Sequence, residues 1–137
     1  MKIKVNSGQM NLKREIAKLI AKWQPILELD HWVIQVIFGK TSDETRPAEC
    51  LPWREMQRAK ITFNLELKEW GDPILRELFV IHELLHCVSA AWAGEIEDVI
   101  SNNVSEELQD EVRKRVNFPE EKYTCDLARI LWSLKRK

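Results

Sequence analysis

The sequence predicts one α+β domain spanning residues 1–137, in which a small antiparallel sheet of about three strands packs on a buried helix. Three observations lead to this prediction. Apolar residues recur at intervals of three and four near both ends of the chain, which indicates N- and C-terminal helices. Short alternating segments between them indicate strands. Residues 73–93 are apolar on two sides, as in a helix that is covered on both.

The N-terminal part should contain a helix followed by a strand. Residues 1–6 alternate weakly, which suits a short strand or an ordered tail. Apolar residues at helical spacing cover 9–28, and Pro25 should end or kink that helix. Residues 32–38 are rich in β-branched and aromatic side chains that alternate, so we expect a strand there.

Two further strands are expected after a polar loop at 39–47. Residues 48–53 suit a short strand that Pro52 confines to an edge of the sheet. Residues 58–64 alternate more clearly. We expect Ala59, Ile61 and Phe63 to point inward and Lys60 and Thr62 to point outward.

The C-terminal half should be helical. Asp72 is a suitable N-cap for the helix over 73–93, because a proline follows it at the first helical position. Gly94 should end that helix. A half-exposed helical stretch follows, and Pro119 should open a last helix that runs to about residue 134.

The composition excludes some partners and suggests a location. With 21 basic and 22 acidic residues the net charge is −1, which gives no basis for binding nucleic acid or an anionic membrane. No apolar stretch approaches the roughly 18 residues of a membrane span, and the first ten residues lack the apolar core of a signal peptide. The cysteines are odd in number and form no C-x-x-C pair, which favours a reducing, cytoplasmic location: Cys50, Cys87 and Cys125.

The segment His82-Glu83-Leu84-Leu85-His86 is an H-E-x-x-H motif inside the predicted buried helix. Four helical residues advance by about 400°, so the two histidines share a face and can bind one tetrahedral Zn²⁺ ion. Glu83 is rotated by about 100° from His82, which suits a base for the metal-bound water rather than a ligand. Two histidines and a glutamate are costly to bury without a partner, which favours a metal site.

A catalytic zinc ion needs a third protein ligand, for which the sequence offers several candidates. The other histidine, His31, follows Asp30 at an expected helix-to-strand turn and should be solvated. Glu106 and Glu107 look more like the solvated first turn of a helix. The last helix offers Glu120, Glu121, Cys125 and Asp126. A face of small and apolar residues suited to packing on the motif helix consists of Glu121, Thr124, Cys125, Ala128 and Leu131.

Four segments together resemble the compact H-E-x-x-H metallopeptidases of the gluzincin type, which include ImmA/IrrE-like proteins and small phage- or prophage-encoded metallopeptidases. The matching segments, within about 30–135, are residues 32–36, residues 59–63, His82 to His86, and Glu121 with Leu127-Ala128. The resemblance implies a zincin-like domain with zinc held by His82, His86 and Glu121 and with Glu83 as catalytic base. It also implies a sheet edge that holds an extended peptide.

Two function hypotheses follow from these residues. In the first, the chain is a zinc metallopeptidase that hydrolyses peptide or protein substrates, with Glu83 as base. In the second, it is a zinc-stabilised binding or regulatory protein with little or no turnover. The second stays open because no histidine or tyrosine is evident as an oxyanion stabiliser; Tyr123 should point away from the Glu121 face. The sequence does not determine the oligomeric state.

Overall fold

The computed structural model describes residues 7–136, except for the side chains of Ser7, Ala91 and residues 116–121 and 135–136. The expected segment at residues 1–6 lies outside the described part. The elements in chain order are α1 (Ser7–Ile26), β1 (Val33–Phe38), β2 (Ala48–Trp53), the 3-10 turn η1 (Arg54–Met56), β3 (Arg58–Phe63), the 3-10 turn η2 (Lys68–Gly71), α2 (Pro73–Asn103) and α3 (Glu106–Arg136). Helices and a small sheet segregate along the chain, which confirms the α+β class.

The three strands form one sheet in the order β1-β3-β2. The sheet is mixed, so the prediction of an antiparallel sheet is wrong: β3 pairs antiparallel with β2 but parallel with β1. The reason is topological. The loop after β1 reverses the chain, and β2 is placed one position away, so the gap between two opposed strands is filled by β3. A strand in that position must run parallel to one of its neighbours.

The inner face of the sheet was predicted correctly. Ala59, Ile61 and Phe63 are buried and pack in one core with side chains of α1 and α2. Thr62 points to the other face with Lys60, as expected, yet only 6% of it is exposed. Because β3 is the central strand, Thr62 is flanked on that face by its register partners in β1 and β2.

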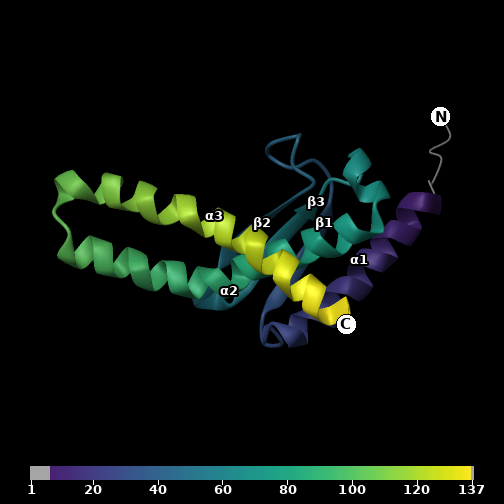
Figure 1. Ribbon diagram of the computed structural model, residues 1–137, viewed down its shortest axis with the longest axis horizontal. Helices are drawn as coiled ribbons and strands as arrows, with labels where there is room; N and C mark the ends of the chain where they lie inside the picture. The colour runs from purple at the N-terminus through teal and green to yellow at the C-terminus, as the bar shows by residue number, and fades with distance from the viewer. Residues whose placement is uncertain (1–6, 137) are drawn as a thin grey trace.

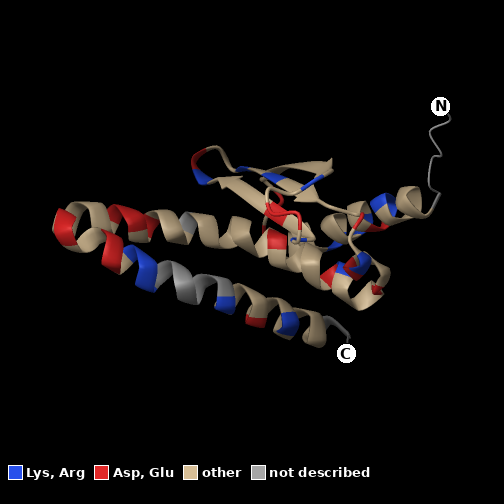
Figure 2. Cartoon of the chain, turned by 90° about the horizontal axis from the view of Figure 1, so that it is seen from above, with Lys and Arg blue, Asp and Glu red and all other residues tan. Residues whose placement is uncertain are grey.

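Helix α2 lies between the sheet and α3, and the N-terminal part of α2 also packs against α1 (Figures 1 and 2). Most buried residues of α2 lie between Val80 and Cys87, with Ile100 further along the helix, and the core cluster includes Ile16 and Trp23 from α1. The central helix is therefore apolar on more than one side because more than one layer covers it.

Both long helices continue through residues that the sequence suggested as boundaries. Gly94 lies inside α2, and Pro119 lies inside α3 rather than at its start. A Cβ atom at residue 94 would overlap the guanidinium of Arg54, which forms an ion pair with Asp98 at 3.3 Å. The glycine therefore provides room for a neighbouring side chain instead of a helix stop.

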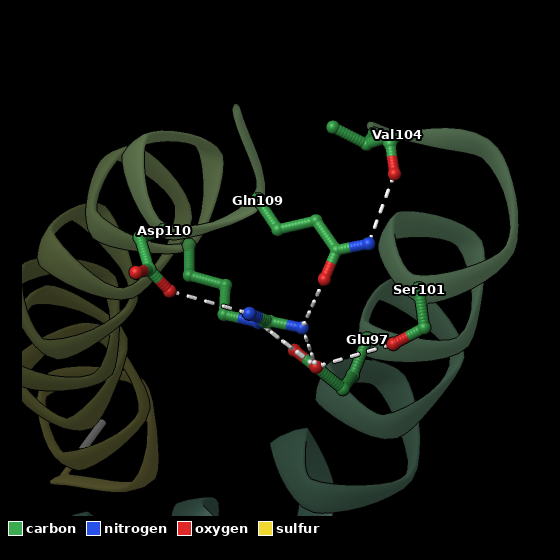
Figure 3. Close-up of polar contacts among 6 residues, drawn as sticks. Glu97, Ser101, Val104, Gln109 and Asp110 are labelled. Carbon is green, nitrogen blue, oxygen red and sulfur yellow. Dashed lines mark hydrogen bonds and ion pairs between the residues drawn. The ribbon is translucent and has the colours of Figure 1, made fainter. Parts of the chain in front are cut away.

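The α2–α3 hairpin closes at residues 104–105, and a polar network holds its end together (Figure 3). Arg113 contacts Glu97 at 2.7 Å and Asp110 at 3.5 Å. Gln109 donates a hydrogen bond of 2.9 Å to the carbonyl of Val104 (Figure 3). The hydrogen bond from Arg113 is the main cause that lowers the pKa of Glu97, so the contact is retained until the pH falls below the ordinary range of a glutamate.

No helix within residues 7–136 is long and apolar enough to cross a membrane.

The start of α2 yields a direct test of the fold. The Ile74 amide donates a 2.9 Å hydrogen bond to the Asp72 carboxylate, as predicted for an N-cap. We expect Asp72→Ala to lower the free energy of unfolding by about 1 kcal/mol, because a helix N–H loses its partner. Urea denaturation measures the loss, and Asp30→Ala, at an exposed turn position, is the control. An equal effect of both substitutions would contradict the capping role.

Candidate metal and catalytic site

The H-E-x-x-H motif lies in the part of α2 that is buried most completely. Val80, Ile81, Leu84 and Cys87 around it are at most 1% exposed. His82 and His86 are half-buried. The apolar spacing that makes this segment helical therefore also holds both imidazoles at fixed positions on one face.

The two histidines lie as a shared metal ion requires. Their Nε2 atoms are 3.2 Å apart, and the ring planes are inclined by 79°. Two nitrogen ligands of one tetrahedral zinc ion, each at about 2.0–2.1 Å, are separated by about 3.3 Å. The pair therefore fits zinc as it stands, without a change of rotamer.

Glu83 lies beside the pair in the same cleft. Only 6% of the residue is exposed, although it carries a carboxylate. A buried glutamate at the rim of a metal-binding face has the position of a proton acceptor. The role of catalytic base that the sequence predicts for Glu83 stays a prediction.

The cleft has a volume of about 540 Å³ and lies between α2 and the sheet edge formed by β2. Its polar lining comes from the histidine pair, Glu83 and the segment just before β2. The lining residues are Ser42, Arg46, Pro47, Ala48, Glu49, Cys50, Leu51, Phe79, His82, Glu83, His86 and Cys125. The size suits a short peptide segment or a small molecule.

Strand β2 borders this cleft as an edge strand with free backbone groups. The Asn64 amide donates to the Pro47 carbonyl at 2.9 Å, which continues the β2–β3 register by one pair. Bonded and non-bonded pairs alternate in an antiparallel ladder. Ala48, Cys50 and Pro52 therefore direct their backbone groups to the outer edge, and Pro52 is tolerated there because no partner strand needs its N–H.

Cys125 of α3 contacts the other nitrogen of His82. Its Sγ lies 3.6 Å from Nδ1, so it lies on the opposite side of the ring from the Nε2 pair. This position does not suit the role of third zinc ligand, for which the sequence offered Cys125 as one candidate. It suits a partner that fixes the orientation of the imidazole.

The other candidate ligands are distributed over α3. Thr124 and Ala128 are buried, which confirms the face that the sequence assigned to packing on α2. Glu121 belongs to the same helix one turn before Cys125, but its side chain lies outside the described part, as does that of Glu120. Among the side chains that the structure describes, no group of three metal-binding residues is found.

Glu106 and Glu107 are excluded as ligands by their distance. Both are exposed in the first turn of α3, at the closed end of the hairpin (Figure 1). From His82 to that end α2 advances by about 30 Å at 1.5 Å per residue. His31 is exposed at a turn, and Tyr123 is 67% exposed, as expected for both.

Sequence reasoning missed Ser42 and Arg46, which it treated only as parts of a polar loop. Arg46 is the one cationic side chain among the residues that line the cleft. It lies 3.8 Å from Asp43 and is 68% exposed. The sequence offered one signal for Arg46, which is its position just before β2, the strand that borders the motif helix.

Cys50, which lines the cleft, contacts the buried thiol of Cys87. The Sγ atoms of Cys50 and Cys87 are 3.9 Å apart. The pKa of Cys50 is raised, first by its hydrogen bond with Cys87, then by burial and by the negative charges of Cys87 and Glu83. Cys50 is therefore a neutral thiol at physiological pH and not a nucleophile.

Comparisons of this chain with protein-family models, with curated proteins and with solved structures find no match.

The raised pKa of Cys50 predicts a change of stability with pH. Unfolded Cys50 ionises near its ordinary value of about 8.5, whereas the folded thiol does not. Its contribution is therefore complete below that pH and is lost as the pH rises above it, by up to about 1.4 kcal/mol per pH unit. We expect the difference in unfolding free energy between wild type and Cys50→Ala to shift accordingly in urea titrations from neutral to alkaline pH. A difference that is constant with pH would contradict the burial of the thiol.

Proposed function

We propose that this protein is a zinc-dependent peptide hydrolase, with His82, His86 and Glu121 as the metal ligands and Glu83 as the catalytic base. The observation that carries the proposal is the separation of 3.2 Å between the two Nε2 atoms, beside a buried glutamate in an open cleft. A location in the reducing cytoplasm agrees with its three free cysteines.

The path of α3 supports Glu121 as the third ligand. The two helices of the hairpin run in opposite directions, and Cys125 contacts His82. The residue one turn before Cys125 on α3 is therefore level with the residue one turn after His82 on α2. This brings residue 121 level with His86. Thr124, on the same face, is buried toward α2.

When bound, zinc would lower the pKa of a water molecule and polarise the scissile carbonyl. Glu83 would accept the proton of the attacking water and deliver it to the leaving amine, because a single carboxylate in reach of both atoms serves both steps. Cys125 would hold the His82 ring in place from the Nδ1 side. The surrounding apolar side chains of α2 would limit the access of other water.

The substrate class follows from the free edge of β2. An extended peptide can pair with the outward backbone groups of Ala48 and Cys50, which would lay it across the cleft in front of the histidines. Arg46 is placed to support the negative charge that develops on a substrate carbonyl oxygen. The cleft thus supplies a backbone template, a base and a cation.

The second candidate function is that of a zinc-stabilised binding or regulatory protein with little turnover. The observation that favours it is the exposure of Arg46, which shares its charge with Asp43 and is a weaker electrophile than a buried donor. In this case the same cleft would bind a peptide segment without cleaving it.

The first test is metal content. We expect about one zinc per chain in protein prepared without chelator, measured by elemental analysis, since two preorganised imidazoles favour this ion. His82→Ala and His86→Ala should lose it, and Glu121→Gln should weaken zinc binding by about 10–100-fold. His31→Ala, an exposed histidine, is the control. Wild-type protein without metal, whose melting temperature added zinc does not raise, would refute the site.

The second test separates hydrolysis from binding. We expect Glu83→Gln to retain zinc and the fold but to abolish cleavage in a library of proteome-derived peptides, because an amide cannot accept a proton. Equal cleavage by wild type and Glu83→Gln would reveal a contaminating protease. No cleavage by either, with zinc present, would favour the binding function.

The third test concerns Arg46. We expect Arg46→Ala to lower kcat by about tenfold with little change in zinc content, because the side chain acts on the substrate and not on the metal. Lys40→Ala, an exposed cation before the same loop that does not line the cleft, is the matched control. An unchanged kcat for Arg46→Ala would exclude the charge from catalysis.

A further inference from the structure

The α2–α3 hairpin has an apolar face that no described part of the chain covers. On α2, Val88, Trp92 and Val99 are 43%, 63% and 59% exposed. On α3 the exposed apolar residues are Tyr123, Leu127, Ile130 and Leu134, between 44% and 67% exposed. These side chains do not take part in the cleft described above.

The exposed residues form one stripe on each helix. At 100° per residue, Val88, Trp92 and Val99 lie within about 40° of one another, and the four residues of α3 lie within about 60°. Their intervals of three, four and seven are those of a coiled-coil seam. Such spacing is typical of a helix face that packs against another helix.

Both stripes border the same groove. A cleft of about 440 Å³ between the two helices is lined by Leu85, Val88, Ser89, Trp92, Tyr123, Thr124 and Leu127. It shares no lining residue with the cleft of the histidines. A second helical hairpin placed on this groove would complete a four-helix bundle.

Few of the described side chains in the outer part of the hairpin are buried. Beyond Cys87 on α2, Ile100 is the only buried residue among those whose side chains are described, and on α3 only Thr124 and Ala128 are buried. Ion pairs such as Arg113–Glu97 are largely exposed and contribute little. Two helices with so small a common core are marginal in water, so an added apolar surface would be stabilising.

The distribution of charge identifies the occupant as a second copy of this chain. The closed end of the hairpin is acidic on balance (Figure 2). Residues 95–115 include three basic residues, Arg113, Lys114 and Arg115, and seven acidic ones: Glu95, Glu97, Asp98, Glu106, Glu107, Asp110 and Glu111. Residues 122–136 of α3, toward the opposite end, include four basic residues and one acidic residue. A two-fold, antiparallel arrangement places each acidic end against the basic end of the partner, whereas a parallel one would oppose two acidic ends.

The size of the surface agrees with this occupant. Seven large side chains at these exposures present on the order of 700 Å² of apolar area. That is more than scattered surface residues provide and is close to the roughly 800 Å² per partner in a standard interface. We propose that the α2–α3 hairpin is a dimerisation arm, through which two copies of the chain pack antiparallel as a four-helix bundle.

The mass in solution tests the proposal on the full chain. Light scattering coupled to gel filtration at about 100 μM should give twice the 16.2 kDa of one chain, and the melting temperature should rise with concentration. Trp92→Glu and Leu127→Glu should each give a folded monomer by circular dichroism. Val33→Glu, 59% exposed on the far edge of the sheet, should remain a dimer.

Charge reversal tests the orientation. In an antiparallel dimer, the double substitution Glu106→Lys with Glu107→Lys should weaken dimerisation at least tenfold, because the new positive charges meet the partner's basic end. In a parallel dimer the same substitution would relieve the repulsion between two acidic ends and tighten binding. The control pair is Glu44→Lys with Glu55→Lys, exposed and outside the arm. A monomeric wild type, a dimer that survives both Trp92→Glu and Leu127→Glu, or a tighter charge-reversed dimer would each overturn the proposal. Zinc content of the same samples reports the proposed function separately.

Discussion

The structure depends on two half-buried imidazoles and a buried carboxylate within an apolar helix. Such groups are costly to remove from water, and the cost is offset only if they form hydrogen bonds, pair with a charge or bind a metal. The chain surrounds the first turns of α2 with the sheet, α1 and α3. Both histidines also line a cleft.

The layers also divide the tasks of the site. Strand β2 supplies an open backbone edge on one side of the cleft, and the preceding loop supplies the one cation of its lining. Helix α3 contacts the outer nitrogen of His82 through Cys125. The orientation of the His82 ring thus depends on α3, although His82 belongs to α2. The site is therefore sensitive to the packing of α3.

The long helices serve two separate surfaces. The first half of α2 forms the base of the cleft that the histidines line. The exposed apolar residues of α2 and α3 border a groove that shares no lining residue with that cleft. The continuity of α2 through Gly94 connects the two surfaces in one rigid element. Packing on the arm would therefore stabilise the helix that holds the histidines without covering them.

The sequence by itself determined the local features of this protein. Apolar spacing predicted α1 and the buried part of α2, alternation predicted β3, and Asp72 with Pro73 predicted the start of α2, because each depends on residues within one or two turns. The i, i+4 spacing likewise predicted that His82 and His86 share a face.

Only the tertiary structure decided what depends on distant segments. The parallel pairing of β1 with β3 follows from the order in which strands occupy the sheet, which no local pattern encodes. Gly94 and Pro119 carry signals for helix ends, but packing between α2 and α3 and the room needed by Arg54 outweigh them. The contacts of Cys125 with His82 and of Cys50 with Cys87 join residues 43 and 37 positions apart, so spacing could name these thiols but not their partners.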